Sequence, residues 1–296
     1  MPYMGEIAAL ATAVLWSGTS IAFSEASIKV GTVYVNVTRL ILAITYLVIT
    51  LLFFGVEVSL SFRQIVFLSI SGFIGLVVGD TFLFNAYRNI GARISMLIMS
   101  LAPAIAALLA YFFLGENLSL LGILGIVITI IGIALVVLKR EEKPSSTYKI
   151  DYIGVFYAFM GAVGQAVGLI FAKFALNDGA INSFLANIMR LTSALIILYP
   201  LAAMTGRFNA PVKVFMNDKK AFIFTVIGSI LGPFFGITLS LVSITYTKIG
   251  IASTLMATVP IIMLPMVRFY YKERLSWLSI TGAFIAVAGI ALLFWV

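Results

Sequence analysis

The sequence contains no cysteine and no histidine, and charged residues make up only 10% of its 296 residues. These absences exclude disulfides, thiolate nucleophiles, Cys/His metal sites and imidazole acid–base groups, so we expect no cofactor and no metal. A soluble fold uses about 25% charged residues to cover its surface. Because 62% of this chain is apolar, it cannot cover itself against water. The composition predicts an integral membrane protein whose surroundings are the lipid bilayer.

Charge of one sign is in excess: 19 basic and 11 acidic residues give a net charge of +8. Such an excess is compatible with nucleic-acid binding, but in a membrane protein it more often reflects basic loops that stay on the cytoplasmic side. We therefore expect no nucleic-acid partner.

Long apolar runs fill most of the chain. A transmembrane helix needs about 20 predominantly apolar residues, and ten stretches meet this requirement. The sequence thus predicts an all-α membrane protein with ten spans, near residues 5–24, 32–54, 64–86, 95–114, 119–138, 153–175, 182–204, 221–244, 250–270 and 276–296.

Residues 139–147, Lys-Arg-Glu-Glu-Lys-Pro-Ser-Ser-Thr, form the most hydrophilic run of the chain. This run predicts a division into a first five-helix unit at 1–138, a linker at 139–152 and a second five-helix unit at 153–296. The N-terminus lacks a basic n-region and an obvious cleavage site, so we expect the first span to be retained.

The distribution of basic residues predicts an orientation. With ten spans, three of the 19 Lys and Arg residues (Arg63, Lys173 and Lys248) fall on the face that holds both termini. Fourteen fall on the opposite face, and Arg39 and Arg190 lie within spans. The positive-inside rule then places both termini outside the cytoplasm, in a multi-pass protein of the cell (inner) membrane.

The two halves repeat each other. A shift of 157 residues carries Gly75 and Gly79 onto Gly232 and Gly236, and Pro103 onto Pro260. The same shift carries Glu116-Asn-Leu-Ser119 onto Glu273-Arg-Leu-Ser276, and Gly132-Ile-Ala-Leu135 onto Gly289-Ile-Ala-Leu292. A shift of 151 carries Asn36-Val-Thr-Arg39 onto Asn187-Ile-Met-Arg190. Each copy holds five expected spans, an odd number, so the second copy must cross the bilayer in the opposite sense. Inverted repeats of this kind are common in secondary transporters.

The repeat resembles a known family. Ten spans, a 5+5 repeat and a Pro that lies thirteen residues before Glu-x-Leu-Ser are similar to the EamA family of the drug/metabolite transporter superfamily. The resemblance covers nearly the whole chain and implies efflux or exchange of amino acids and other small metabolites. Relatives usually keep both termini in the cytoplasm, whereas the charge distribution here predicts the reverse.

Asp80 is the one acidic residue well inside an expected span, and Arg39 lies at a similar depth, roughly 9–11 Å from the basic face. The two are candidates for an ion pair between the second and third spans. An ionisable group in a bilayer is costly and marks a functional hypothesis. Asp80 is therefore either the structural partner of Arg39 or a proton-coupling carboxylate.

Arg190 occupies the position of Arg39 in the second copy, but Asp80 aligns with Ile237 there. The arginine therefore lacks the equivalent acid. It either extends to the headgroups or bonds to backbone carbonyls, or it holds a substrate carboxylate or phosphate.

Pro103 and Pro260 predict matched helix breaks in the fourth and ninth spans. A proline inside a helix frees the carbonyl four residues earlier, which belongs to Met99 in one copy and Met256 in the other. Matched breaks are typical of transporter binding sites. A simple packing kink is the alternative.

The family resemblance places the pathway along spans 1, 3, 4, 6, 8 and 9. The polar and aromatic residues inside these spans are candidates for the cavity wall. Gln165 falls beside Trp16 in the repeat, so we expect both to face one cavity. The candidates for substrate binding are Trp16, Ser17, Ser20, Asp80, Thr81, Asn85, Met99, Ser100, Gln165, Arg190, Thr254, Met256 and Thr258.

Two further features have a structural interpretation. Glycines four residues apart (Gly75 and Gly79, Gly164 and Gly168) allow helix backbones to approach closely. Glu116 and Glu273 are expected at the start of the last span of each copy, where a carboxylate meets the positive end of the helix dipole.

The sequence therefore predicts a gradient-driven carrier of a small organic solute that works by alternating access, as a monomer or homodimer. One deep carboxylate is compatible with coupling to protons, and facilitated movement or exchange is equally compatible. A passive channel is the alternative, since it needs only a lined pore. A membrane-embedded enzyme would need clustered catalytic groups, for which this sequence offers little material.

Overall fold

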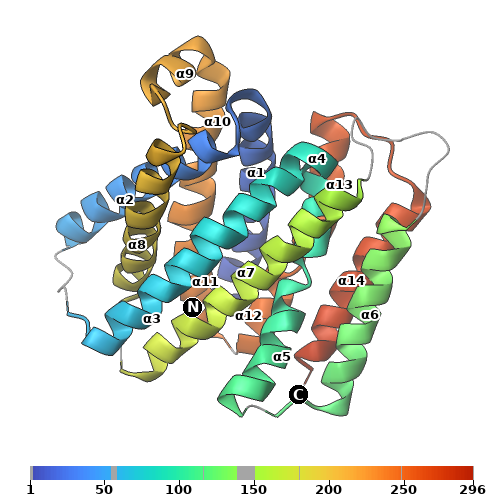
Figure 1. The fold of residues 1–296 in the computed structure, drawn as a ribbon. Helices are drawn as coiled ribbons and strands as arrows, with labels where there is room; N and C mark the ends of the chain where they lie inside the picture. Colours follow the sequence, from blue (N-terminus) through green and yellow to red (C-terminus); the bar gives the residue numbers. More distant parts are fainter. Residues whose placement is uncertain are drawn as a thin grey trace.

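The computed structural model describes residues 3–54, 59–115, 117–138, 151–179, 181–247 and 249–295. Within these ranges the regular elements are all helical (Figure 1). The elements are α1 (Met4–Val30), α2 (Thr32–Phe54), α3 (Phe62–Gly72), η1 (Phe73–Gly79), α4 (Asp80–Met99), α5 (Ala102–Leu114), α6 (Leu120–Val137), α7 (Tyr152–Asn177), α8 (Ser183–Met204), α9 (Pro211–Asn217), α10 (Lys219–Ser229), η2 (Ile230–Gly236), α11 (Ile237–Tyr246), α12 (Ile249–Met256), α13 (Val259–Tyr270) and α14 (Trp277–Leu293).

Eight helical stretches in the described part of the chain are long and apolar enough to cross a membrane, and two shorter apolar helices, Ala102–Phe113 and Trp277–Leu293, accompany them. The eight are Met4–Val30, Thr32–Phe54, Phe62–Met99, Leu120–Val137, Tyr152–Asn177, Ser183–Met204, Lys219–Ser240 and Ile251–Tyr270.

The main difference from the expected spans lies between the third and the fourth. The sequence predicts a connection at residues 87–94, but the structure continues in one helical run from Phe62 to Met99. Only Gly91 leaves the helical conformation, with φ 75° and ψ 166°. Glycine has no Cβ and adopts positive φ without strain, so a single residue accommodates the break.

The connection expected at residues 205–220 contains a short helix, α9, whose Phe215 is buried. Pro211 begins this helix, a position where its missing N–H costs nothing. The linker expected at 139–152 lies outside the described residues as far as 150, and α7 begins directly after Asp151.

Two π-helical segments interrupt the bundle at equivalent places. η1 ends at Gly79 and η2 ends at Gly236, and the repeat relates these two glycines. Each segment joins two α-helices, α3 to α4 and α10 to α11. A π-helical turn leaves a backbone carbonyl outside the regular pattern, so each copy carries the same local irregularity inside an apolar environment.

The first helix of each copy packs into the other copy. α1 lies against α10, η2, α11, α12 and α13, while α7 lies against α3, η1, α4 and α5. Figure 1 shows α7 running beside α4. The two backbones approach closely at the glycines of this contact. A Cβ added at Gly164 would lie only 2.6 Å from the Cα of Gly79, and one at Gly168 would lie 3.1 Å from the Cα of Gly75. The glycine spacing thus permits backbone-to-backbone packing.

α6 and α14, the last helices of the two copies, pack side by side (Figure 1). A Cβ at Gly125 would lie 2.5 Å from the carbonyl oxygen of Gly289, and one at Gly132 would lie 2.7 Å from that of Gly282. The repeat exchanges Gly125 with Gly282 and Gly132 with Gly289, so this interface has the two-fold character of the repeat itself.

Candidate functional site

A buried ion pair lies where α2 meets the start of α4. Arg39 on α2 donates through Nη2 to Oδ2 of Asp80, the first residue of α4. Both side chains are 6% exposed. η1 ends immediately before Asp80, so this carboxylate lies at the junction of η1 and α4. A charge is tolerated at such depth only when it is paired and hydrogen-bonded, and this pair satisfies both conditions.

Gln165 extends the ion pair into a network that spans both copies. Its Nε2 donates to Asp80 Oδ1 at 2.6 Å and to the carbonyl oxygen of Gly75 at 3.3 Å. Since Gln165 lies on α7, the first helix of the second copy, the carboxylate of Asp80 joins the two copies. Each carboxylate oxygen therefore has its own donor.

Asn36 completes the network. Its Oδ1 accepts from Arg39 Nε at 2.9 Å, and its Nδ2 donates to Thr81 Oγ1 at 3.1 Å. The same Nδ2 also lies 3.4 Å from the carbonyl oxygen of Leu76, inside η1. The asparagine therefore orients the guanidinium and binds an irregular carbonyl of the π-helical segment.

Two phenylalanines cover the guanidinium. The Cζ atom of Arg39 lies 5.0 Å from the ring centroid of Phe84 and 5.8 Å from that of Phe23. The two rings lie 5.2 Å apart. Cation–π attraction is strongest where water is excluded, and Phe84 and Phe23 are both buried. The ion pair is thus enclosed by aromatic side chains on one side.

The second copy repeats only half of this arrangement. Asn187 Nδ2 donates to the carbonyl oxygen of Pro233 at 3.2 Å, which matches Asn36 and Leu76. However, Asn187 Oδ1 and Arg190 Nε are both buried without a hydrogen-bond partner. The bond that joins asparagine to arginine in the first copy is therefore missing in the second.

Matched helix breaks lie at Met99 and Met256. α4 ends at Met99 and α5 starts at Ala102, while α12 ends at Met256 and α13 starts at Val259. Pro103 and Pro260 occupy the first turn of α5 and α13, where a proline costs no hydrogen bond. Helix breaks therefore lie at the two places that the sequence predicts, directly before each proline, and the alternative of a kink inside a continuous helix does not apply.

Comparison with known proteins shows the family. The sequence model of the EamA-like transporter family matches residues 3–138 and 152–295. The chain belongs to the EamA-like transporter family. This confirms the resemblance that Pro103, Pro260 and their flanking motifs carry, and the family together with the apolar helices makes the chain a multi-pass membrane protein.

Two further comparisons fit this EamA chain. It is 29% identical over 145 residues to a WAT1-related protein of Arabidopsis thaliana, a match that covers 48% of this chain and 36% of that relative. The chain thus matches about a third of the relative's length. A solved structure, whose title reads only "Crystal structure of protein", matches with a TM-score of 0.65 and 15% identity over 97% of this chain and 95% of that one. This match supports the fold alone.

The EamA structure brings some of the predicted wall residues together and not others. Arg39, Asp80, Thr81 and Gln165 form the network, and Asn85 adjoins it because its Nδ2 donates to the carbonyl oxygen of Thr81 at 2.9 Å. Other candidates bond to nearby carbonyls of their own helical segments: Ser17 to Ala13, Ser20 to Ser17, Ser100 to Leu97 and Thr258 to Leu255. Thr254 and Met256 on α12 are half-buried, and among the described residues neither takes part in the hydrogen bonds of the network.

Trp16 on α1 and Gln165 on α7 lie near each other in the repeat, but they contact different partners. The Trp16 Nε1 atom would lie 2.6 Å from a Cβ added at Gly236, at the end of η2. Trp16 and Met99 both pack against the apolar cluster that contains Phe84 and Met263. Trp16 thus lies against η2 in the second copy, and Gln165 lies against η1 in the first.

Glu273 does not begin a helix, contrary to expectation. Ser276 caps α14 by accepting from the backbone N–H of Ser279, and Ser119 caps α6 in the same way. Glu273 instead accepts from Arg93 Nε at 2.9 Å, and both side chains are largely buried. Burial raises the pKa of Glu273, and Arg93 counteracts this in part. Glu116 lies outside the described residues.

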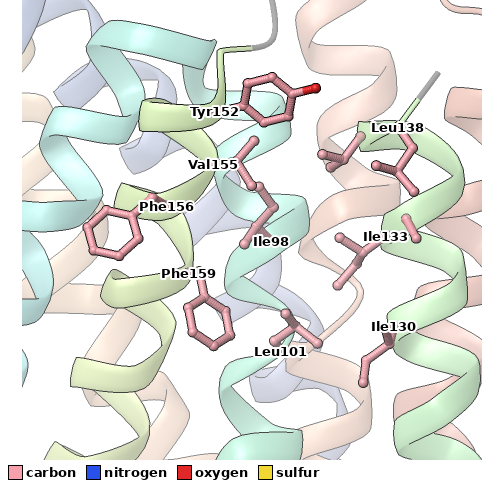
Figure 2. A pocket seen from close by; sticks show the side chains of 11 residues that line it. Ile98, Leu101, Ile130, Ile133, Leu138, Tyr152, Val155, Phe156 and Phe159 are labelled. Atoms are coloured by element: carbon pink, nitrogen blue, oxygen red, sulfur yellow. The ribbon is translucent and has the colours of Figure 1, made fainter. Parts of the chain in front are cut away.

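An apolar groove opens between the end of α4, α6 and α7, with a volume of about 430 Å³. Figure 2 shows Ile98, Leu101, Phe156 and Phe159 around it. Its lining lacks the residues of the polar network, so it is separate from the site. Within the described ranges, no group of three His, Cys, Asp or Glu side chains is placed to hold a metal ion.

Sequence reasoning missed the role of the two asparagines. Asn36 and Asn187 stand out in the sequence only as part of the repeated motif, yet each binds a carbonyl of a π-helical segment. The signal was present in the sequence: an asparagine three residues before an arginine, repeated in two apolar spans. A buried amide needs a partner, and irregular backbone supplies one.

Proposed function

We propose that this protein is a gradient-driven carrier that moves a small organic solute, such as an amino acid or another small metabolite, out of the cell or in exchange. The observation that carries the proposal is the polar network of Asn36, Arg39, Asp80 and Gln165. It joins the two copies inside an apolar bundle. Polar groups at this depth are expensive and typically mark a solute or ion pathway.

The proposed mechanism is alternating access between two inverted copies of five spans each. The long run Phe62–Met99 then counts as the third span and part of the fourth, divided at Gly91, and the short helices α5 and α14 complete the ten. Matched breaks after Met99 and Met256 support this interpretation, because related irregularities in both copies are typical of carriers. The proposed units are 1–138 and 153–296, joined by 139–152.

The proposed location is the cell (inner) membrane, with both termini outside the cytoplasm. Support comes from the excess of Lys and Arg in the loops of one face, because basic loops remain cytoplasmic. The proposed oligomeric state is a monomer or a homodimer. All residues of the polar network belong to one chain, so the proposed site needs no residue from a second copy.

Counterflow in liposomes tests the proposal. Purified protein is reconstituted with unlabelled amino acids inside, and the uptake of the same labelled amino acids is measured against protein-free liposomes. A carrier predicts saturable uptake that internal solute accelerates. A linear, non-saturating flux without acceleration would favour a passive channel, and recovery of a chemically altered solute would favour an enzyme.

A further inference from the structure

The centre of the bundle holds more positive than negative charge. Arg39 and Arg190 are two cations within the spans, and Asp80 is the acid paired with one of them. Guanidinium groups stay protonated in proteins. In the described part of the chain, no ion pair joins Arg190 to an acid. Among the residues that the structure describes, the cluster of Arg39, Arg190 and Asp80 therefore carries one positive charge without an acidic partner.

Arg190 faces the network across the interface between copies. A Cβ added at Gly75 would lie 3.5 Å from Arg190 Nη2 and 3.7 Å from Gln165 Oε1, so these two side chains flank the same turn of η1. Asp80 lies close enough to Arg190 to interact with it electrostatically. Both oxygens of Asp80 already have donors, Arg39 and Gln165. The guanidinium of Arg190 therefore lies beside the network without sharing its hydrogen bonds.

The two copies differ at one bond. In the first, Arg39 Nε donates to Asn36 Oδ1 at 2.9 Å. In the second, Arg190 Nε and Asn187 Oδ1 are both buried and unpartnered, although residues three apart share a helix face. An unmade bond of this kind leaves a buried donor and a buried acceptor at full desolvation cost. A ligand with an acceptor and a donor group would satisfy both.

We propose that the solute is a small organic monocarboxylate, whose carboxylate binds the guanidinium of Arg190. A donor group of the same solute bonds to Asn187 Oδ1. This inference rests on the proposed function and names its solute class. A single carboxylate matches the one excess charge, whereas a phosphate monoester carries about −1.5 to −2 at pH 7. Guanidinium and carboxylate also fit each other in two parallel hydrogen bonds.

The test compares acids with their own amides. Binding of benzoate, pyruvate and glycine, each beside benzamide, pyruvamide or glycinamide, is measured by calorimetry on the purified full chain in detergent. Phenyl phosphate serves as the phosphate probe. The variants are Arg190→Gln and Arg190→Lys, and Arg88→Gln is the matched control because Arg88 is exposed on α4.

The wild type should bind at least one acid more tightly than its amide. Arg190→Gln should weaken the binding of that acid by about tenfold to one-hundredfold, the usual effect of losing a charged hydrogen bond. The affinity for the amide should stay unchanged, Arg190→Lys should recover part of the loss, and Arg88→Gln should bind as the wild type does.

Equal affinity for acids and amides in the wild type would overturn the inference without any variant. Equal losses for both in Arg190→Gln, preference for phenyl phosphate, or no binding of any acid would also overturn it. The proposed function is tested separately. Saturable counterflow of a neutral or cationic solute would support the carrier function and would reject only the proposal that the solute is a monocarboxylate.

Discussion

At the scale of single residues, Asp80 is either the structural partner of Arg39 or a proton-coupling carboxylate. The carboxylate is buried, paired with Arg39 and hydrogen-bonded to Gln165. The sequence predicted the pair from the similar depth of the two residues. It could not predict Gln165 as the third member, because that contact depends on how α7 packs against the first copy.

We predict that Asp80→Asn folds, because an amide still forms hydrogen bonds with its neighbours, but has a lower unfolding temperature and an altered pH profile of uptake. Loss of one partner leaves Arg39 buried without its counter-charge, which typically costs about 3–5 kcal/mol in buried pairs. Thermal unfolding in detergent and uptake into liposomes over a pH series are the measurements. A wild-type pH profile would eliminate Asp80 as the coupling group.

The double variant Arg39→Met with Asp80→Leu separates stability from transport. Replacing both members of a buried pair with apolar side chains is often neutral or stabilising, so we predict an unfolding temperature near that of the wild type. Uptake should remain impaired if the pair serves transport. Wild-type uptake by this double variant would assign the pair a purely structural role.

Glu273 gives the molecule a predictable dependence on pH. Its pKa lies above the ordinary value of 4.5 because burial disfavours the charged form. The folded state then binds the proton more tightly than the unfolded state, so stability is lost as the pH rises from 4.5 through the raised pKa. We predict that Glu273→Gln flattens this step. Arg93→Gln should move the step to higher pH, because Arg93 lowers the same pKa. Unfolding temperatures over a pH series check both, and a step that is identical in all three proteins would contradict the assignment.

At the scale of helices, the glycine pattern was informative but incomplete. Spacing by four residues predicted close helix packing at Gly75, Gly79, Gly164 and Gly168, and the structure places these glycines against one another. The sequence did not reveal that η1 and η2 are π-helical. Asn36 and Asn187 each donate to a carbonyl of one of these segments, and such tertiary contacts cannot be derived from hydropathy.

Gly164→Ala should destabilise the contact between α7 and η1. The added Cβ would lie 2.6 Å from the Cα of Gly79, and a backbone atom cannot move away cheaply, so we predict a loss of about 1–3 kcal/mol. Gly75→Ala is the matched control in the same interface, because its added Cβ meets nothing closer than 3.5 Å. Thermal unfolding of the two variants checks the prediction, and similar values for both would argue against backbone contact.

At the scale of the whole molecule, the repeat predicted two related halves but not their interleaving. α1 packs mainly within the second copy and α7 within the first. The sequence repeat, detected from matched motifs such as Pro103 and Pro260, does not show which copy each helix packs against. Inter-copy ion pairs follow from this interleaving: Arg93 meets Glu273, and Lys29 meets Asp218. Because both ion pairs join the two copies, a movement of one copy relative to the other would affect both of them.

Accessibility from the two faces tests the central claim, a solute pathway between the copies that opens to one side at a time. The natural chain has no cysteine, so Thr81→Cys introduces a single reactive thiol beside the network. We predict that membrane-impermeant maleimides label it from either face. In a second protein, Arg93→Cys and Glu273→Cys are added, and these two cysteines are cross-linked before the cysteine at position 81 is labelled. The cross-link should abolish labelling of position 81 from the membrane face on which the cross-link lies, and labelling from the other face should remain. Equal labelling from both faces in the linked protein, or none in the unlinked one, would contradict the account.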